Sequence, residues 1–286
     1  MRYVIVSDSS SNIFTVEGAE YKTVPMKVIA EKEYVDTPAL DLQGMVSDLQ
    51  QFKGKSGSSC ANVQEWLDAF EGADAVFCVT ISKNLSGSYN SARDAVAEFL
   101  EEHPEKKGYV FDSLAAGPQQ AMVVDKIAQL IAEGNDFDAI VEKTLDYHNH
   151  THILFRLQSL TNLARNGRIN PAVAKIAGVL GIRVIGDVKG GQITPVHKPR
   201  GDKKAIPMLV EMMKERGFYD GALLRIAHCF GEEPALLLRD AVLAEFPNTR
   251  FQLEPTTALC SFYAEEGGLM IGFEGGYNKE NNNRDF

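Results

Sequence analysis

The fold is decided by one stretch, Ala75-Val76-Phe77-Cys78-Val79-Thr80 followed by Ser82-Lys83-Asn84-Leu85-Ser86-Gly87-Ser88. The first six residues form a short apolar run, rich in β-branched and aromatic side chains, which predicts a strand buried on both faces. The next seven residues are typical of a turn and a helix cap. Apolar side chains then recur at helical spacing from Tyr89 to Leu100. We therefore expect a strand, a hydroxyl-rich loop and a helix.

The loop at 82–88 is predicted to lie where open α/β sheets bind ligands. The carboxyl end of a parallel strand meets the N-terminus of the following helix there, and the free N–H groups of that helix favour an anion. Ser86 has two interpretations. It is a helix cap, or it is a cap that also offers its hydroxyl to a ligand. Both interpretations stay open from the sequence.

Strands and helices alternate along the first 150 residues. Residues 2–7 predict a strand that ends in Asp8-Ser9-Ser10-Ser11-Asn12, and residues 108–111 predict one that ends in Asp112-Ser113. A second hydroxyl loop is expected at 54–60. Helical spacing predicts helices at 41–52, 63–70, 117–132 and 137–148. This order predicts an α/β fold with an N-terminal domain over residues 1–150, a doubly wound parallel sheet with a small β insert at about 21–40.

The pattern changes after His150. A strand at 152–157 and a β-hairpin at 182–196 are followed by alternating helices and strands, which predicts a C-terminal mixed α+β domain over residues 151–277. A helix is also expected at 172–180. The polar tail, residues 278–286, is expected to fray. Three alternating histidines, His148, His150 and His152, are expected to face solvent or to interact with a helix end.

Composition excludes several classes of protein. The chain has 286 residues, with 29 basic and 39 acidic side chains and a net charge of −10, which argues against a nucleic-acid surface. No apolar run is long enough to span a membrane, and no signal peptide is recognised, so we expect a cytoplasmic protein. The four cysteines form no C-x-x-C pair, which predicts reduced thiols and no metal site.

Four motifs resemble those of the DegV family of bacterial lipid-binding proteins, which includes the fatty-acid-binding subunit of the bacterial fatty acid kinase. Together the motifs cover nearly the whole chain. They are Val6-Ser7-Asp8-Ser9-Ser10, Ser58-Ser59, Leu85-Ser86-Gly87-Ser88-Tyr89-Asn90-Ser91-Ala92, and Leu163-Ala164-Arg165-Asn166-Gly167-Arg168-Ile169 with the downstream Lys198-Pro199-Arg200-Gly201.

The resemblance implies a non-catalytic carrier of two α/β domains with one long-chain fatty acid between them. It implies that a separate fatty acid kinase phosphorylates the carboxylate, that membrane-surface contact is transient, and that no cofactor is used. It places Arg168 and Arg200 near the entrance, facing the kinase or a phosphate; alternatively, Arg168 only braces a turn. The residues that the resemblance assigns to the carboxylate are Ser58 or Ser59, Ser86, Gly87 and Tyr263.

The sequence departs from the family near its C-terminus. Tyr263 stands where the family usually has a histidine, and Glu265-Glu266-Gly267 stands for Gly-Pro-Gly. A tyrosine hydroxyl can donate to a carboxylate but carries no positive charge. We expect the two glutamates to make the mouth of the site less favourable for an anion, so the headgroup is bound differently or the ligand is another amphiphile.

An enzyme is the main alternative class. A serine- or cysteine-dependent hydrolase or transferase would use Ser59, Cys60 or Ser86 as its nucleophile. The sequence shows no histidine in a recognisable triad context, so such a nucleophile would lack a base.

Overall fold

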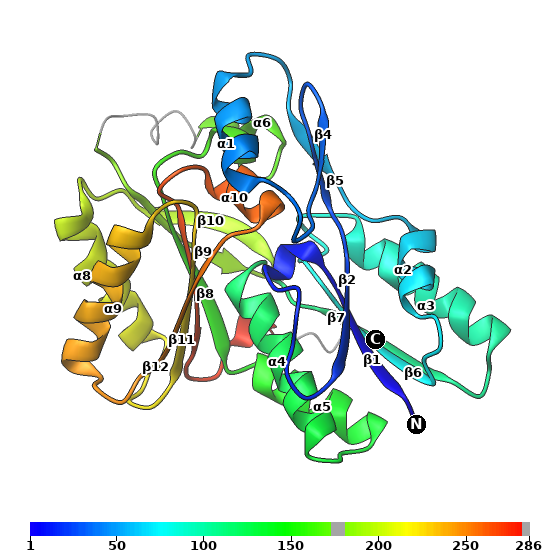
Figure 1. Cartoon of the computed structure of the whole chain (residues 1–286). Coiled ribbons are helices and arrows are strands. Elements are labelled where there is room, and N and C mark those ends of the chain that lie inside the picture. Colours follow the sequence, from blue (N-terminus) through cyan, green and yellow to red (C-terminus); the bar gives the residue numbers. More distant parts are fainter. Residues whose placement is uncertain (173–180, 282–286) are drawn as a thin grey trace.

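The computed structural model describes residues 1–172 and 181–281 (Figure 1). Almost all of the helix expected at 172–180, and the last five residues of the chain, lie outside the described residues. No helix in the described part of the chain is long and apolar enough to cross a membrane.

The N-terminal half contains a four-stranded parallel sheet in the order β2-β1-β6-β7. All six residues of the central strand β6 are buried, as its apolar run predicts. Because the strands are parallel, their carboxyl ends meet at one edge of the sheet. The strands are β1 (Tyr3–Asp8), β2 (Glu20–Val24), β6 (Ala75–Thr80) and β7 (Lys107–Asp112).

Helices cover both faces of this sheet, which confirms the doubly wound arrangement. Helices α2 (Val63–Ala69) and α3 (Ser88–Glu102) pack on one face through an apolar cluster that includes Trp66, Phe70 and Phe99. The cluster on the other face includes residues of α4 (Pro118–Ala132) and α5 (Phe137–His148).

A small antiparallel sheet, in the order β4-β3-β5, stands next to the parallel sheet. It consists of β3 (Lys27–Ile29), β4 (Glu33–Val35) and β5 (Gly57–Ser59), with α1 (Leu42–Gln51) between the last two in sequence. Two expectations were wrong here. Residues 20–24 form an edge strand of the parallel sheet rather than part of the insert. Gly57–Ser59 is a strand rather than a loop, because it pairs with β3.

The C-terminal half contains a six-stranded mixed sheet in the order β10-β9-β8-β13-β11-β12. Its strands are β8 (Thr151–Leu157), β9 (Val184–Lys189), β10 (Gln192–His197), β11 (Leu223–His228), β12 (Arg250–Pro255) and β13 (Leu269–Glu274). Helices α8 (Asp202–Glu215) and α9 (Glu232–Glu245) contribute to an apolar core on one face. The short helices α6 (Thr161–Arg165) and α10 (Ala258–Ala264) follow β8 and β12.

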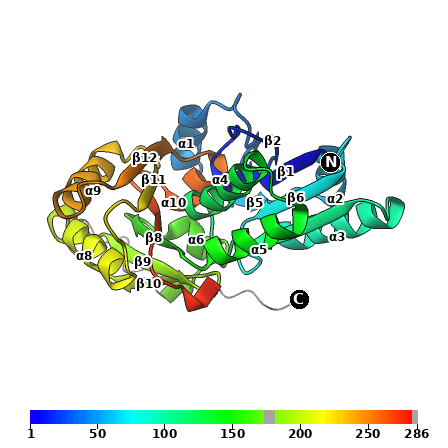
Figure 2. The same cartoon turned by 90° about the horizontal axis from the view of Figure 1, so that it is seen from below.

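Helix α4 joins the two halves. It contacts β1 and β6 of the parallel sheet and β8, β11 and β13 of the mixed sheet, and it lies in the middle of the molecule in both views (Figure 1, Figure 2). The approach is tight at Gly272 of β13, where an added Cβ would lie 2.8 Å from Cβ of Pro118. Glycine is required at this position because α4 rests directly on the strand.

Two expectations about polar residues near α5 were wrong in part. Of the three histidines, His150 does interact with a helix end, because its Nδ1 lies 2.9 Å from the Asp146 carbonyl oxygen in the last turn of α5, but the other two do not face solvent. His148 and His152 are buried, and their Nε2 atoms lie 2.8 Å from the Ser113 carbonyl oxygen and 2.9 Å from the Gly276 carbonyl oxygen. Residues 278–281 of the tail are not frayed. The Asn281 amide donates to the His148 and Thr151 carbonyl oxygens at 2.7 and 2.9 Å, which fixes this part of the chain at the junction between the end of α5 and the start of β8.

Candidate functional site

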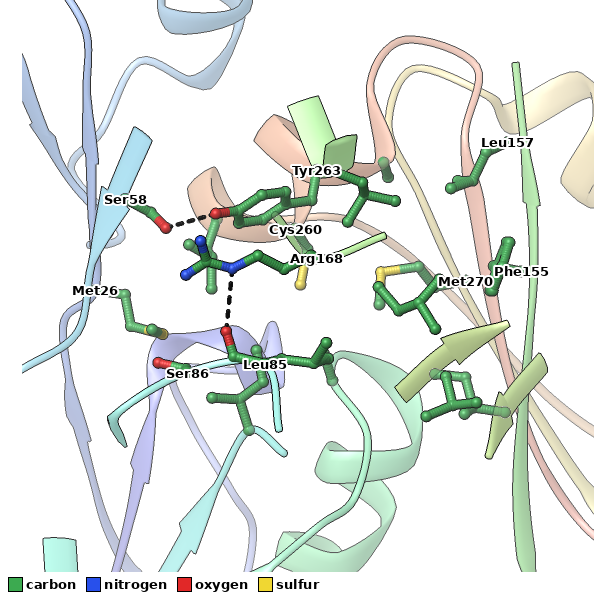
Figure 3. A pocket seen from close by; sticks show the side chains of 18 residues that line it. Met26, Ser58, Leu85, Ser86, Phe155, Leu157, Arg168, Cys260, Tyr263 and Met270 are labelled. Carbon is green, nitrogen blue, oxygen red and sulfur yellow. Dashed lines mark hydrogen bonds between the residues drawn. The ribbon is translucent and has the colours of Figure 1, made fainter. Parts of the chain in front are cut away.

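One cavity lies where the parallel sheet, the small sheet and the mixed sheet meet (Figure 3). Its polar lining residues gather at one end. The described residues that line the cavity are Met26, Ser58, Ile81, Leu85, Ser86, Ala116, Ile153, Phe155, Leu157, Leu163, Arg168, Val188, Ile193, Leu259, Cys260, Tyr263, Ala264 and Met270.

Ser58 and Tyr263 form a hydroxyl pair at the polar end. Their oxygen atoms lie 2.8 Å apart, and either can be the donor. Ser58 comes from β5 of the small sheet and Tyr263 from α10, so the pair joins residues that are distant in sequence. Two hydroxyls have two hydrogens, and the pair uses one of them. The other remains available to a ligand.

Ser86 lies opposite this pair, in the loop between β6 and α3 (Figure 3). Its Oγ accepts a hydrogen bond of 3.2 Å from the backbone N–H of Ser88, the first residue of α3. Ser86 precedes the N-cap residue Gly87, and its hydroxyl satisfies the first N–H of the helix as an acceptor. None of the described residues receives its hydrogen, so the same group can also donate to a ligand. The two interpretations of Ser86 are compatible.

Arg168 is the only charged side chain among the described residues that line the cavity. Its Nε donates to the Leu85 carbonyl oxygen at 3.2 Å, and its Nη1 donates to the Asn166 carbonyl oxygen. The guanidinium lies over the Tyr263 ring, 5.8 Å from the ring centre. Arg168 therefore does brace a turn. No carboxylate in the described part of the chain pairs with it, which leaves its positive charge available.

Three of the expected site residues do not line the cavity. Side chains alternate along a strand, so Ser59 faces away from the side of β5 that carries Ser58. Gly87 lies next to Cys60, whose sulfur would be 3.5 Å from an added Cβ. Arg200 is exposed, and it forms an isolated β-bridge with Ile182.

The two glutamates also lie outside the cavity, which corrects the expectation that they make its mouth less favourable for an anion. Glu265 accepts a hydrogen bond from the backbone N–H of Asn162 at 3.1 Å, and Glu266 accepts one from the Gln50 amide at 2.6 Å. Both line a separate groove between α1, α6 and α10. Their charges therefore do not face the polar end of the cavity.

Asp8, at the end of β1, organises the strand ends beneath the site. Its buried carboxylate accepts hydrogen bonds from the Ile81 N–H at 3.0 Å, the Ser88 hydroxyl at 2.5 Å and the Gln120 amide at 2.9 Å, and also from the Ser10 hydroxyl. These donors lie at or next to the ends of β1 and β6 and the starts of α3 and α4. The first motif, Val6-Ser7-Asp8-Ser9-Ser10, thus positions the loop that carries Ser86.

Asp36 fixes α10, and sequence analysis missed it. Its buried carboxylate accepts from the N–H groups of Ala258 and Leu259 at 2.8 and 3.2 Å, and from the hydroxyls of Ser9 and Thr257 at 2.9 and 3.1 Å. Burial raises the pKa of Asp36, and the hydrogen bonds oppose that rise. Asp36 caps the helix that carries Tyr263 from a distant part of the chain. A lone aspartate after a short strand gives no sequence signal for this role.

The thiol of Cys260 lines the cavity but is poorly suited to act as a nucleophile. Burial raises the pKa of Cys260 well above its ordinary value, and its Sγ–H donates to the Ser10 carbonyl oxygen at 3.4 Å. The described lining residues include no histidine, carboxylate or lysine that could take a proton from a serine or a thiol.

These features define a class: a two-part α/β protein whose halves enclose one apolar chamber with a polar end. Comparison with known proteins identifies the family. The sequence model of one protein family, described as uncharacterised proteins of the DegV family, matches residues 2–275 of this chain. A DegV domain-containing protein of Streptococcus gordonii is 36% identical over 280 residues, which cover 96% of this chain and 99% of the relative. The chain belongs to the DegV family.

Two solved structures are similar over nearly their whole length. One is a DegV family protein from Eubacterium eligens loaded with heptadecanoic acid, with 37% identity, a TM-score of 0.93 and coverage of 96% of this chain and 99% of that chain. The other is the Fatty Acid Kinase (Fak) B3 protein of Streptococcus pneumoniae loaded with linoleic acid, with 34% identity, a TM-score of 0.92 and the same coverage.

Proposed function

We propose that this protein binds one long-chain fatty acid in the cavity and presents the carboxylate to a separate fatty acid kinase. The observation that carries the proposal is the distribution of polarity in the cavity. A cluster of hydroxyls and one unpaired guanidinium occupy one end, and apolar side chains line the rest. Both similar structures described above hold long-chain fatty acids. The N-terminal domain, residues 1–150, would supply Ser58 and Ser86 to the carboxylate, and the C-terminal domain, residues 151–277, would add Arg168 and Tyr263 and much of the apolar lining.

Burial of the acyl chain supplies the affinity. Each methylene that leaves water contributes about 0.8 kcal/mol, so a chain of fourteen methylenes gains about 11 kcal/mol before entropy costs. The polar end then sets the orientation. The free hydrogen of the Ser58–Tyr263 pair, the Ser86 hydroxyl and the Arg168 guanidinium can converge on a carboxylate, which needs several donors.

Access to the carboxylate supports a separate kinase. Ser58, Ser86, Arg168 and Tyr263 are all half-buried, whereas the apolar residues of β8 that line the cavity are buried. The reacting end of the ligand would therefore lie near the surface, where another protein can reach it. The likeness to a protein named as part of a fatty acid kinase favours the same division of labour.

The carrier would act in the cytoplasm and would exchange its ligand during transient contact with a membrane surface. The four cysteines are free, which suits a reducing compartment. The protein itself would be non-catalytic and would need no cofactor or metal.

Native mass spectrometry of the protein purified from bacteria tests ligand binding. We expect an adduct with the mass of a long-chain fatty acid, and after delipidation we expect saturable binding of the free acid but weaker binding of its methyl ester. If the delipidated protein binds no fatty acid, the proposal is wrong. Equal binding of acid and ester would favour a different amphiphile. Stoichiometric labelling of Ser59, Cys60 or Ser86 by an activity-based probe would favour the hydrolase or transferase instead.

The kinase step needs its own experiment. The loaded protein, mixed with a bacterial fatty acid kinase catalytic subunit and ATP, should yield acyl phosphate, trapped with hydroxylamine as the hydroxamate. The same mixture without the carrier is the control. An equal yield without the carrier would rule out presentation.

A further inference from the structure

The wall of the cavity across from the hydroxyls is formed by β8, with Val188 of β9 and Ile193 of β10 beside it. Ile153, Phe155 and Leu157 alternate along this strand and line the cavity on the same face. In Figure 3, Phe155 and Leu157 lie on the opposite side of the cavity from Ser58 and Ser86. An acyl chain with its carboxylate at the polar end would therefore point its terminal methyl group toward this part of the sheet.

Phe155 has two direct neighbours across the sheet, Met270 on β13 and Gly186 on β9. A Cβ added to Gly186 would lie 2.5 and 2.6 Å from Cε2 and Cε1 of Phe155, and closer still to Cζ. The Phe155 ring therefore lies over Gly186 and occupies the space that a side chain at this position would need. Aromatic side chains commonly cover glycines on a neighbouring strand in this way.

The backbone gives no other reason for a glycine at 186. This residue lies in the middle of β9, and its φ is not positive, so conformational freedom does not require glycine there. Glycine inside a strand weakens the strand but permits close approach of another group. Gly186 therefore accommodates the ring of Phe155. Because residue 186 has no side chain, the ring can lie close to the backbone of the sheet.

We propose that Phe155, lying flat over Gly186, is the end wall that determines the longest acyl chain the cavity accepts. This inference rests on the proposed function and adds its chain-length specificity. With the ring flat on β9, the cavity extends to the sheet. A ring lifted by a side chain at 186 would occupy space that the end of the acyl chain needs, and a smaller side chain at 155 would extend the space.

Two substitutions test the wall in opposite directions, using delipidated full-length protein and a series of saturated fatty acids from twelve to twenty carbons. Gly186→Ala should lift the ring and move the preference to shorter acids. The affinity for a fatty acid should fall about fourfold for each methylene that no longer fits in the cavity, because burial of one methylene contributes about 0.8 kcal/mol. Phe155→Leu should move the preference to longer acids. In the double variant the methyl group added at 186 has no ring to displace, so the profile should match that of Phe155→Leu alone.

Two matched controls separate the wall from general damage. Gly54→Ala also forces a ring to move, because its Cβ would lie 2.9 Å from Cε1 of Phe52, which does not line the cavity. Phe273→Leu removes the same volume from the buried core of the same sheet. Both controls should keep the wild-type preference.

The outcomes separate this inference from the proposed function. If the wild type binds no fatty acid, the proposed function fails. If the wild type shows a chain-length preference that Gly186→Ala and Phe155→Leu leave unchanged, the end wall lies elsewhere and the inference is wrong. If Gly186→Ala does not fold, the comparison of Phe155→Leu with Phe273→Leu decides.

Discussion

The hydroxyl pair of Ser58 and Tyr263 should act toward a carboxylate as one donor shared by two residues. The pair holds two hydrogens, and the 2.8 Å hydrogen bond between the oxygens uses one of them. If Ser58 is changed to alanine, the Tyr263 hydroxyl loses its partner but keeps a hydrogen for the ligand. If Tyr263 is changed to phenylalanine, the Ser58 hydroxyl keeps one in the same way, and the ring under Arg168 stays in place.

The magnitudes follow from this count. Each single substitution should weaken fatty-acid binding by only about 0.5 kcal/mol, roughly twofold, because a donor remains. The double variant leaves the carboxylate without a hydroxyl on this side. It should lose about 2 kcal/mol, roughly thirtyfold, as expected for a hydrogen bond to a charged group. The double loss should thus exceed the sum of the single losses by about 1 kcal/mol.

Displacement of a fluorescent fatty acid from the four delipidated proteins measures this cycle. Ser59→Ala is the matched control, because it removes a hydroxyl from the same strand on the face away from Ser58, and it should bind like the wild type. The reasoning is refuted if either single variant already loses as much as the double variant, or if the two single losses simply add.

Three further predictions concern single residues. Ser86→Ala should weaken fatty-acid binding by about 1–3 kcal/mol, because the carboxylate loses a donor; an unchanged titration isotherm would contradict that role. Tyr263→His should bind up to about tenfold more tightly at pH 5.5 than at pH 8, because histidine gains a positive charge near pH 6.5. The wild type should show no such step, and its presence there would reveal another titrating group. Burial lowers the pKa of His148 to about 4, so the unfolded chain takes up the proton first as pH falls. The free energy of unfolding should therefore fall as the pH drops below 6.5, and the fall should level off near pH 4. Between pH 7 and pH 5 the loss should be about 2 kcal/mol. Urea unfolding should show this loss, and His148→Gln should reduce it; equal slopes for both proteins would contradict the assignment.

The sequence predicts best what depends on local pattern. The apolar run at 75–80 and the helical spacing after it locate β6 and α3, and the order of such units identifies the doubly wound sheet. The motif around Ser86 likewise places one polar residue of the cavity. Its hydroxyl-rich loop follows a buried strand, which is a local feature.

Features that depend on distant pairing could not be predicted. Gly57–Ser59 has no strand-like composition, and it is a strand only because it pairs with β3. Glu265 and Glu266 have an obvious charge, but the direction of each side chain depends on helices α1 and α6 beside them. The polar residues next to His148 in the sequence predict an exposed side chain, but Asn281 from the tail of the chain packs against His148 and donates a hydrogen bond to its carbonyl oxygen. In each case the decisive neighbour is far away in the sequence.

The shared packing of α4 limits how the ligand can enter. Ten of the fifteen residues of this helix are buried, and it contacts both the parallel and the mixed sheet. A rotation that separates the two halves would expose buried apolar surface of α4 to water, at a free-energy cost of about 25 cal/mol for each Å². A fatty acid should therefore enter through a local opening at the cavity, without separation of the two halves. Thermal unfolding should show a single transition that includes both halves.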